Sequence, residues 1–275
     1  MDLLQAAVLG IVQGITEFLP ISSSGHLIIV PYLFGWQEFE NNLPFDVALH
    51  LGTTAGLLLF FWKDWYLLVT GFLKQLFDSE RKLLSDPHSR LFLTIILGSI
   101  PAALFGFYFQ DFVEGVVRDP LIIGEMLIGF GLILYWAEKR GNGRKNLEQI
   151  RLRDGLIIGI WQAVSLIPGV SRSGSTISGG FFQGLDRETA TRFSFLLATP
   201  AVAGAALFKV KDIMELGFGS ERGVFLVGFL ASLVSGLLVI KFLLQFIKTN
   251  SFTVFVVYRI LLGMILIGLV ATGYS

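Results

Sequence analysis

The first apolar region of the chain, residues 3 to 35, is broken at its centre by Pro20-Ile21-Ser22-Ser23-Ser24-Gly25-His26. A second apolar region, 155 to 185, is broken by Pro168-Gly169-Val170-Ser171-Arg172-Ser173-Gly174-Ser175. The halves that flank each break have about 15 residues or fewer, whereas a helix needs about 20 to cross the hydrocarbon core. Irregular backbone persists at membrane depth only where protein or a wet cavity satisfies its polar groups. We therefore expect two re-entrant helix-loop-helix hairpins.

The composition of the rest of the chain also indicates a membrane protein. Hydrophobic side chains make up 53% of the 275 residues and charged ones 15%, whereas soluble domains have about 25% charged residues. The zero net charge gives no indication of nucleic-acid binding, and the absence of cysteine excludes disulfides and thiolate chemistry. We expect one all-α integral membrane domain, residues 1 to 275, with six transmembrane helices besides the two hairpins. The six spans lie at roughly 44 to 62, 90 to 109, 120 to 138, 189 to 209, 223 to 246 and 252 to 273.

The two hairpins are related in sequence. Residues 9 to 28 align without a gap to residues 158 to 177 with seven identities. One hairpin and three spans then make a repeat, and an odd number of spans turns the second copy upside down. We expect an inverted repeat, with the first copy at about 1 to 140, the second at about 150 to 275, and hairpins that enter from opposite faces. The identical pairs are Gly10/Gly159, Ile11/Ile160, Gln13/Gln162, Ser22/Ser171, Ser24/Ser173, Gly25/Gly174 and Ile28/Ile177.

The basic residues of the loops predict the orientation. Most lie in or beside two loops, within 63 to 90 and 139 to 153, which are cytoplasmic by the positive-inside rule. The short loop between them has Arg118 as its one basic residue and is expected outside. Both termini and the first hairpin then face outside, and the second hairpin enters from the cytoplasm. The loop that contains Lys211 and Arg222 departs from the rule, because this topology puts it outside.

The first hairpin carries candidate catalytic residues. Gln13 and Glu17 are four residues apart, so they share one helical face that points toward the polar turn. A carboxylate in an apolar segment is costly without a partner or a function, so Glu17 is either a site residue or a structural one. Ser22-Ser23-Ser24-Gly25 predicts a capped helix start, where free N–H groups and the helix dipole attract anions. His26 could act on a phosphorus centre as nucleophile, base or acid, although a lone histidine is more often structural.

The second hairpin has a cation at the equivalent position, Arg172. Its planar guanidinium suits phosphate oxygens; alternatively it pairs with Glu17, and the two roles could coexist. Two opposed helix N-termini and an arginine form a site for dense negative charge. Two linked phosphates would fill this site better than a carboxylate ligand would. A pyrophosphate carried on a lipid could reach such a site laterally from the bilayer. The other residues of this turn that we expect to bind the anion are Ser171, Ser173, Gly174 and Thr176.

Other polar residues outside the hairpins are expected to have structural roles. Arg259 lies inside the last span, where a charge is costly, and we expect it to pair internally; a role in the site is the alternative. Asp46 and His50 begin the first full span and are expected at the membrane interface.

These motifs resemble those of the bacterial undecaprenyl-diphosphate phosphatases, also called bacitracin-resistance proteins. The resemblance extends over essentially the whole chain. It implies removal of the terminal phosphate from undecaprenyl diphosphate, which regenerates the monophosphate carrier for peptidoglycan and other envelope polymers and confers bacitracin resistance. It also implies a multi-pass protein of the bacterial inner membrane that binds membrane lipid, and the first hairpin indicates a site open to the outer face. The matching residues are Gln13-x-x-x-Glu17, Ser22-Ser23-Ser24-Gly25-His26 and Pro168-Gly169-Val170-Ser171-Arg172-Ser173-Gly174-Ser175-Thr176.

The resemblance also implies roles for individual residues. The family motif has Glu or Gln at the first position, so Gln13 leaves this chain with one carboxylate where some members have two. A divalent cation, Mg²⁺ or Ca²⁺, is implied, with Glu17 as its ligand. Arg172 is expected to bind the diphosphate and stabilise charge during transfer. The nucleophile stays open among Ser23, His26 and a water activated by His26 or Glu17. Substrate contacts are expected from Gln13, Ser22, Ser24 and Gly25.

Three other classes of protein share some features with this sequence. Inverted repeats with broken helices also occur in secondary transporters, one version of which would flip the lipid phosphate. The phosphatidic-acid-phosphatase type requires a second histidine after the arginine, and the last histidine of this chain is His88. An intramembrane protease would require H-E-x-x-H or an aspartate pair within the spans, and neither occurs. The sequence leaves open whether the protein forms a homodimer.

Overall fold

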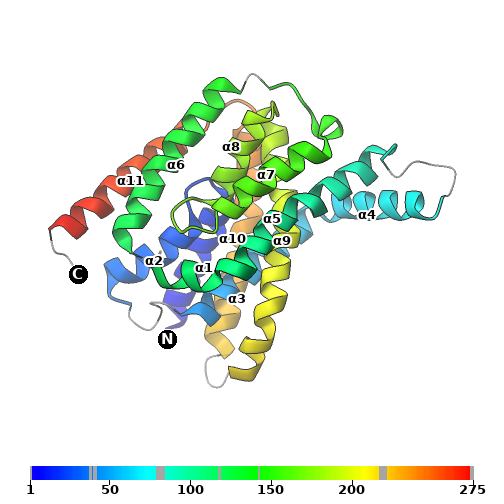
Figure 1. Ribbon diagram of the computed structural model, residues 1–275. Helices are drawn as coiled ribbons and strands as arrows, with labels where there is room; N and C mark the ends of the chain where they lie inside the picture. Colours follow the sequence, from blue (N-terminus) through cyan, green and yellow to red (C-terminus); the bar gives the residue numbers. More distant parts are fainter. Residues whose placement is uncertain are drawn as a thin grey trace.

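The computed structural model describes residues 2–36, 39, 42–78, 84–116, 119–141, 143–216 and 222–272, without the side chains of Leu43, 110–116 and 205–216. All regular secondary structure in this part is helical apart from one isolated β-bridge, so the all-α prediction is confirmed. The helices are α1 (Leu3–Phe18), α2 (Ser23–Phe34), α3 (Leu43–Phe60), α4 (Trp62–Leu76), α5 (Pro87–Val116), α6 (Pro120–Arg140), η2 (Leu147–Gln149), α7 (Leu152–Val164), α8 (Arg172–Phe182), α9 (Arg187–Leu216), α10 (Arg222–Phe246) and α11 (Thr253–Ala271) (Figure 1).

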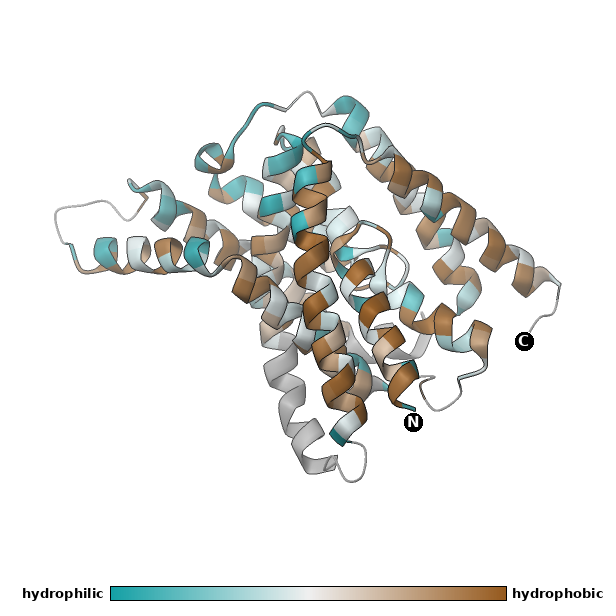
Figure 2. Ribbon diagram, turned by 180° about the vertical axis from the view of Figure 1, so that it is seen from behind, coloured by the Kyte–Doolittle hydropathy of each residue, from teal (hydrophilic) through white to brown (hydrophobic). Residues whose placement is uncertain are grey.

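Four helices of the described part are long and apolar enough to cross a membrane: α6, α10, α11 and the segment Pro87–Phe109 of α5. They coincide with four of the six expected spans, and α9 runs unbroken through a fifth, at 189 to 209. Hydrophobic residues cover the middle of the helices, whereas hydrophilic ones gather at the end that carries the 141–151 segment (Figure 2). The chain is therefore a multi-pass membrane protein.

The remaining expected span, 44 to 62, corresponds to α3, but the residues after it form a further helix that was expected as a loop. Helix α3 ends at Phe60, and the chain bends by 71° into α4. The bend occurs where apolar residues give way to Trp62-Lys63-Asp64, and Asp64 accepts a 2.7 Å hydrogen bond from Arg192 Nη2 on α9. Helix α4 then packs along α5 and extends away from the helix bundle (Figure 1). The helix α4 was missed because Lys63, Asp64 and Lys74 interrupt the apolar pattern after Trp62 and suggested a loop.

The two interrupted regions form the predicted helical hairpins, α1 with α2 and α7 with α8. These helices have 16, 12, 13 and 11 residues, so none is long enough to cross a bilayer alone. The second helix of each hairpin begins after a serine with positive φ, 76° at Ser22 and 72° at Ser171. Each serine Oγ accepts a backbone N–H three residues on, from Gly25 at 3.4 Å and from Gly174 at 3.2 Å. Equivalent residues thus adopt the same uncommon backbone conformation in both turns.

The first helix of each hairpin packs against a helix from the other half of the chain, α1 on α10 and α7 on α5. Equivalent glycines make both contacts possible. A Cβ on Gly10 would lie 2.6 Å from the Gly228 carbonyl oxygen, and one on Gly159 would lie 2.1 Å from that of Gly98. Helices α6 and α11 run side by side (Figure 1). This exchange is the arrangement that an inverted repeat requires, although the boundaries of the two repeats stay a prediction.

Candidate active site

The turns of the two hairpins meet at an ion pair between Glu17 and Arg172. Arg172 Nη2 lies 2.8 Å from Glu17 Oε1, and the side chains are 14% and 7% exposed. A second contact joins the turns, because Ser173 Oγ donates to the Leu19 carbonyl at 3.0 Å. The pairing of Arg172 with Glu17, one of the two roles that the sequence left open, is therefore confirmed. The two motifs are brought together although 155 positions separate these residues.

The second carboxylate oxygen of Glu17 receives the hydroxyl of Ser23. Ser23 Oγ donates to Glu17 Oε2 at 2.6 Å, and Gln13 Nε2 donates to the same oxygen at 3.1 Å. A hydroxyl bound to an ionised oxygen at this distance is a charge-assisted hydrogen bond. It is also the geometry from which a carboxylate removes the proton of a serine nucleophile. Gln13, Glu17, Ser23 and Arg172, all predicted from the sequence, thus form one contact network.

His50 joins this network, although we expected it at the membrane interface. Its Nε2 lies 3.7 Å from Glu17 Oε2, and its side chain is 34% exposed. Its Nδ1 lies 2.7 Å from the carbonyl oxygen of Asp46 and donates to it, because a carbonyl can only accept. His50 is the site residue that sequence reasoning missed. One feature of the sequence could have indicated it: His50 lies one helical turn after Asp46, on a helix that the topology places near the first hairpin.

His26 has different neighbours from the ones we expected. Its Nδ1 lies 2.6 Å from the Ser22 carbonyl and its Nε2 lies 2.6 Å from the Tyr258 hydroxyl, while the imidazole stacks on the Tyr258 ring. The Nδ1 donates to the carbonyl, so the Nε2 of the neutral ring accepts from the tyrosine. Among the described residues, no hydrogen bond or ion pair joins His26 to Glu17 or Arg172. Both ring nitrogens are occupied, so attack by His26 would first require Tyr258 to move.

The start of α8 presents unused donors beside the ion pair. Arg172 Nε and Nη1 are buried and have no hydrogen-bond partner within the described ranges. The first N–H groups of a helix have no intrahelical acceptor, and only those of Gly174 and Ser175 are bound to the capping Ser171. Buried donors without a protein partner are rare, and these donors are available to a bound ligand. Arg172 and the start of α8 therefore offer a binding site for an anion.

The remaining predicted site residues have mixed roles. Ser24 Oγ lies 3.3 Å from Ser22 Oγ, and Ser173 Oγ lies 3.2 Å from Ser171 Oγ, so the hydroxyls of each turn bind one another. Thr176, predicted to bind substrate, is fully buried and bonds the Arg172 carbonyl at 2.8 Å and Ser194 Oγ at 2.6 Å. It fixes α8 against α9, and its hydroxyl does not face the anion site in this arrangement.

The donor set does not form a protein-only metal site. The described part of the chain contains no group of three or more His, Cys, Asp or Glu side chains that could hold a metal ion. Both oxygens of Glu17 already accept hydrogen bonds, and Gln13 provides an amide where some family members have a second carboxylate. Oε1 of Glu17 accepts one hydrogen bond, from Arg172, so a cation at this oxygen would lie beside the guanidinium. The protein groups of the described part thus do not form a metal site on their own.

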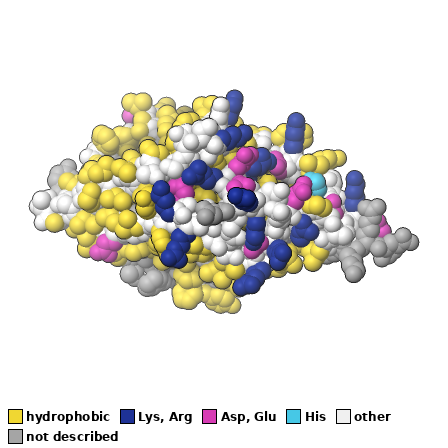
Figure 3. Space-filling view, turned by 90° about the horizontal axis from the view of Figure 1, so that it is seen from above, with side chains coloured by type: hydrophobic (Ala, Val, Ile, Leu, Met, Phe, Trp, Pro, Cys, Tyr) yellow, Lys and Arg dark blue, Asp and Glu magenta, His cyan; other side chains and the backbone are white. Residues whose placement is uncertain are grey.

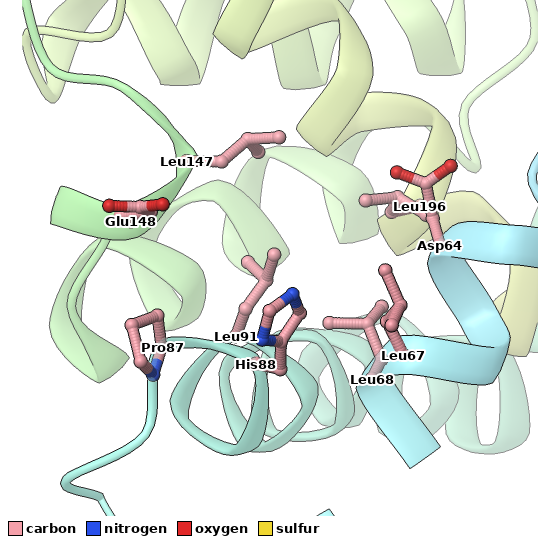
Figure 4. A pocket seen from close by; sticks show the side chains of 9 residues that line it. All are labelled: Asp64, Leu67, Leu68, Pro87, His88, Leu91, Leu147, Glu148 and Leu196. Atoms are coloured by element: carbon pink, nitrogen blue, oxygen red, sulfur yellow. The ribbon is translucent and has the colours of Figure 1, made fainter. Parts of the chain in front are cut away.

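A cavity elsewhere in the structure carries none of the predicted motifs. It lies between α4, α5, η2 and α9, and its polar side chains are Asp64, His88 and Glu148 (Figure 4). Asp64 is paired with Arg192, and the remaining lining residues are apolar. This cavity is therefore a weaker candidate than the junction of the two hairpins.

Fold and site together define a multi-pass membrane protein in which two broken helices bring an arginine, a carboxylate and a serine hydroxyl into contact. The comparison with known families agrees with this class. The chain belongs to the family of bacitracin resistance protein BacA, whose family model matches residues 6–265. The resemblance that the motifs indicated is confirmed.

Individual relatives are similar over nearly their whole length. The undecaprenyl-diphosphatase of Pelotomaculum thermopropionicum is 46% identical over 271 residues, which cover 98% of both chains. The undecaprenyl-diphosphatase of Thermodesulfovibrio yellowstonii is 44% identical over 265 residues, 96% of each chain. That of Moorella thermoacetica is 46% identical over 267 residues, 97% of each chain.

Proposed function

We propose that this protein hydrolyses undecaprenyl diphosphate to undecaprenyl phosphate and inorganic phosphate. The observation that carries the proposal is the contact of Glu17 with Arg172 at 2.8 Å and with Ser23 at 2.6 Å. A base, a cation and a hydroxyl nucleophile meet there at the start of two helices, which is the set of groups that phosphoryl transfer uses. Relatives with the same activity in their name, 46% and 44% identical, support the substrate.

In this mechanism Ser23 Oγ attacks the terminal phosphorus while its proton passes to Glu17 Oε2. The bond from that phosphorus to the bridging oxygen breaks, and the lipid monophosphate leaves. The proton passes from Glu17 to the departing monophosphate, which restores the carboxylate. Water then attacks the phosphoserine and gives a proton to Glu17. The bond from phosphorus to Ser23 Oγ breaks, the proton returns from Glu17 to Ser23 Oγ, and inorganic phosphate is released. Arg172 binds the phosphoryl oxygens and stabilises the charge that develops on them.

Ser23 is the best supported of the nucleophiles that the sequence left open. Its hydroxyl is already bound to the carboxylate at 2.6 Å, whereas both nitrogens of His26 are occupied. A water activated by Glu17 would have to share Oε1 with Arg172 or displace Ser23 from Oε2. The need for Mg²⁺ or Ca²⁺ stays a prediction of the family resemblance; one carboxylate together with substrate phosphates is a common way of binding Mg²⁺.

The basic residues support a location in the bacterial inner membrane with a defined orientation. Lysine and arginine side chains gather on the face of the molecule seen in Figure 3. Because positive loops stay inside, this face is cytoplasmic, and the first hairpin enters from the outer face. Arg81, Lys82 and Arg118, used in the sequence argument, lie outside the described residues, as does the side chain of Lys211. The basic residues of the 139 to 153 segment are Lys139, Arg140, Arg144, Lys145, Arg151 and Arg153.

The enzyme then recycles the lipid carrier for peptidoglycan and other envelope polymers. Because bacitracin sequesters the diphosphate, a phosphatase that removes it confers resistance. We expect the lipid to reach the site between the hairpin turns laterally from the bilayer.

The test is phosphate release from undecaprenyl diphosphate by the purified protein in detergent. We expect turnover by the wild type, loss of most turnover in Glu17→Ala and Arg172→Ala, and unchanged turnover in His88→Ala, because His88 lies in the cavity of Figure 4 and, among the described residues, has no hydrogen bond or ion pair with either hairpin. Circular dichroism and gel filtration should show that all variants are folded. A folded wild type that releases no phosphate, or full turnover in Arg172→Ala, would contradict the proposal. Movement of lipid phosphate across vesicles without hydrolysis would indicate a transporter instead.

A further inference from the structure

A second arginine, Arg259, joins the turns of the two hairpins from a helix that belongs to neither. It lies within α11 and is fully buried. Its Nη1 donates to the Pro20 carbonyl of the first turn at 3.1 Å. Its Nη2 donates to the Gly169 and Val170 carbonyls of the second turn at 3.0 and 2.9 Å. One guanidinium therefore holds the backbone of both turns.

The space for this side chain is formed by glycines. A Cβ on Gly174, the third residue of α8, would lie 2.9 Å from Arg259 Nη1. A Cβ on Gly131 of α6 would lie 3.4 Å from the Cβ of Arg259. On this side the guanidinium also donates to two α6 carbonyls, through Nε to Leu127 at 3.0 Å and through Nη2 to Met126 at 3.3 Å. The guanidinium thus lies directly behind the start of α8, where Arg172 presents its free donors.

The contacts of Arg259 also fix the orientation of α8. In a trans peptide the C=O and N–H groups point in opposite directions. Because the Val170 carbonyl points to Arg259, the N–H of Ser171 points away from it. Ser171 adopts its positive φ of 72° next, and α8 begins with Arg172. Holding the Val170 carbonyl therefore helps to set the direction in which α8 and Arg172 leave the turn.

The charge of Arg259 has no counter-ion. Its five hydrogen-bond acceptors are backbone carbonyl oxygens, and it forms no ion pair within the part of the chain that the structure describes. The charge of Glu17 is matched by Arg172. A buried charge is costly in a low-dielectric surrounding unless it is compensated. The junction of the hairpins thus carries one excess positive charge, which a bound anion would neutralise.

We propose that Arg259 is a positioning residue of the anion site. It holds the two turns so that Arg172 meets Glu17 and Ser23, and it adds a positive charge behind the start of α8. The second part rests on the proposed function, because the diphosphate of the substrate is the anion that supplies the counter-charge.

Two substitutions separate the geometric effect from the charge effect. Arg259→Lys keeps the charge but replaces a planar fork that contacts five carbonyls by one ammonium. Arg259→Gln also removes the charge. The measurements are kcat and KM for a short polyprenyl diphosphate in detergent, the affinity for inorganic pyrophosphate, and the melting temperature. We expect kcat to fall at least tenfold in both variants, pyrophosphate affinity to stay within threefold in Arg259→Lys, and that affinity to fall at least tenfold in Arg259→Gln.

Leu266→Ala is the matched control for a loss of stability. Leu266 lies on the same helix, is 1% exposed and packs in an apolar cluster with Ile29, Ile123 and Leu127. We expect it to lower the melting temperature while kcat of the folded protein stays within twofold of the wild type. Gly174→Ala serves as a second test if the Arg259 variants do not fold, because its Cβ would displace the guanidinium from the other side. It is expected to lower kcat at least fivefold.

Several results would overturn the proposal. An Arg259→Lys or folded Gly174→Ala protein with kcat within twofold of the wild type would refute the positioning role. The same role fails if Leu266→Ala loses as much kcat as Arg259→Lys at an equal drop in melting temperature. Unchanged pyrophosphate affinity in Arg259→Gln would refute the charge role. If the wild type binds pyrophosphate but releases no phosphate from the lipid, the proposed function fails while the pyrophosphate comparison still tests Arg259.

Discussion

Replacing Glu17 with glutamine keeps the shape of the side chain and removes its charge. In the wild type one carboxylate oxygen accepts from Arg172 at 2.8 Å, and the other accepts from Ser23 at 2.6 Å. Glutamine has one acceptor oxygen and one donor nitrogen. Whichever way the amide is turned, either Arg172 or Ser23 faces an N–H group and loses its acceptor. The amide also cannot take a proton from Ser23 at neutral pH.

The structure allows the size of this effect to be worked out. General base catalysis contributes about 10²–10⁴ in rate, so we expect kcat to fall about 10³-fold, or about 4 kcal/mol of activation free energy at 1.36 kcal/mol per factor of ten. Substrate binding should not weaken. The substitution removes a negative charge next to the diphosphate and releases Arg172 from its only ion-pair partner within the described ranges. We therefore expect KM to be unchanged or lower.

The assay is phosphate release from undecaprenyl diphosphate in detergent, with a melting curve to verify folding. Ser23→Ala should lower kcat by a similar factor, and the double variant should be little worse than either single variant, because residues that act as one unit are not additive. Retention of more than a tenth of wild-type turnover by Glu17→Gln would refute the assignment of the base. Multiplied losses in the double variant would show that Ser23 and Glu17 act independently.

Three further predictions follow from contacts in the same structure. Arg172→Lys should raise KM and lower kcat by about 10²-fold, because a lysine cannot bind a phosphoryl group and a carboxylate through one planar fork; steady-state kinetics on the folded variant checks this. His50→Ala should lower kcat roughly tenfold, because it removes the imidazole 3.7 Å from the reacting carboxylate. This factor corresponds to about 1.4 kcal/mol of lost transition-state stabilisation. Wild-type KM and kcat in this variant would contradict the prediction. Gly159→Ala should prevent folding or lower the melting temperature strongly, because the Cβ would lie 2.1 Å from a backbone oxygen of α5. The control is Gly129→Ala, whose Cβ meets nothing within 4 Å and which should melt as the wild type does.

The hairpins were predictable because local sequence encodes them. Proline, glycine and serine interrupt each apolar region, and the flanking helices are too short to cross the membrane. The serine caps were predictable for the same reason, and both are observed at Ser22 and Ser171. The alignment of Gly10 with Gly159 also has a physical cause. Each glycine lets the backbone of a helix from the other half of the chain approach closely.

The equivalence of the hairpins ends at the reacting groups. The side chain of Gln13 binds Glu17, whereas the side-chain amide of its counterpart Gln162 has no hydrogen-bond partner in the described segments. The reason is that Leu166 occupies the position equivalent to Glu17. The sequence alignment predicted this divergence, with acid and nucleophile candidates in one turn and the cation in the other.

Contacts between distant helices were not predictable from local patterns. The position of His50 near Glu17 depends on how α3 packs against α1 and α10. The hydroxyl of Tyr258 binds His26 across 232 positions, so no local pattern indicated that both imidazole nitrogens are occupied. Arg259 was expected to pair internally, and it does so with backbone carbonyls, which no side-chain pattern indicates.

The most direct test of the central claim is to trap the phosphoryl group on the enzyme. The protein would be mixed with polyprenyl diphosphate labelled with ³²P at the terminal phosphate, quenched in acid within one turnover, digested and mapped. Acid preserves phosphoserine, so the account predicts label on the peptide that contains Ser23 and none in Ser23→Ala. Phosphate release by Ser23→Ala at the wild-type rate, or label on any other residue, would contradict it.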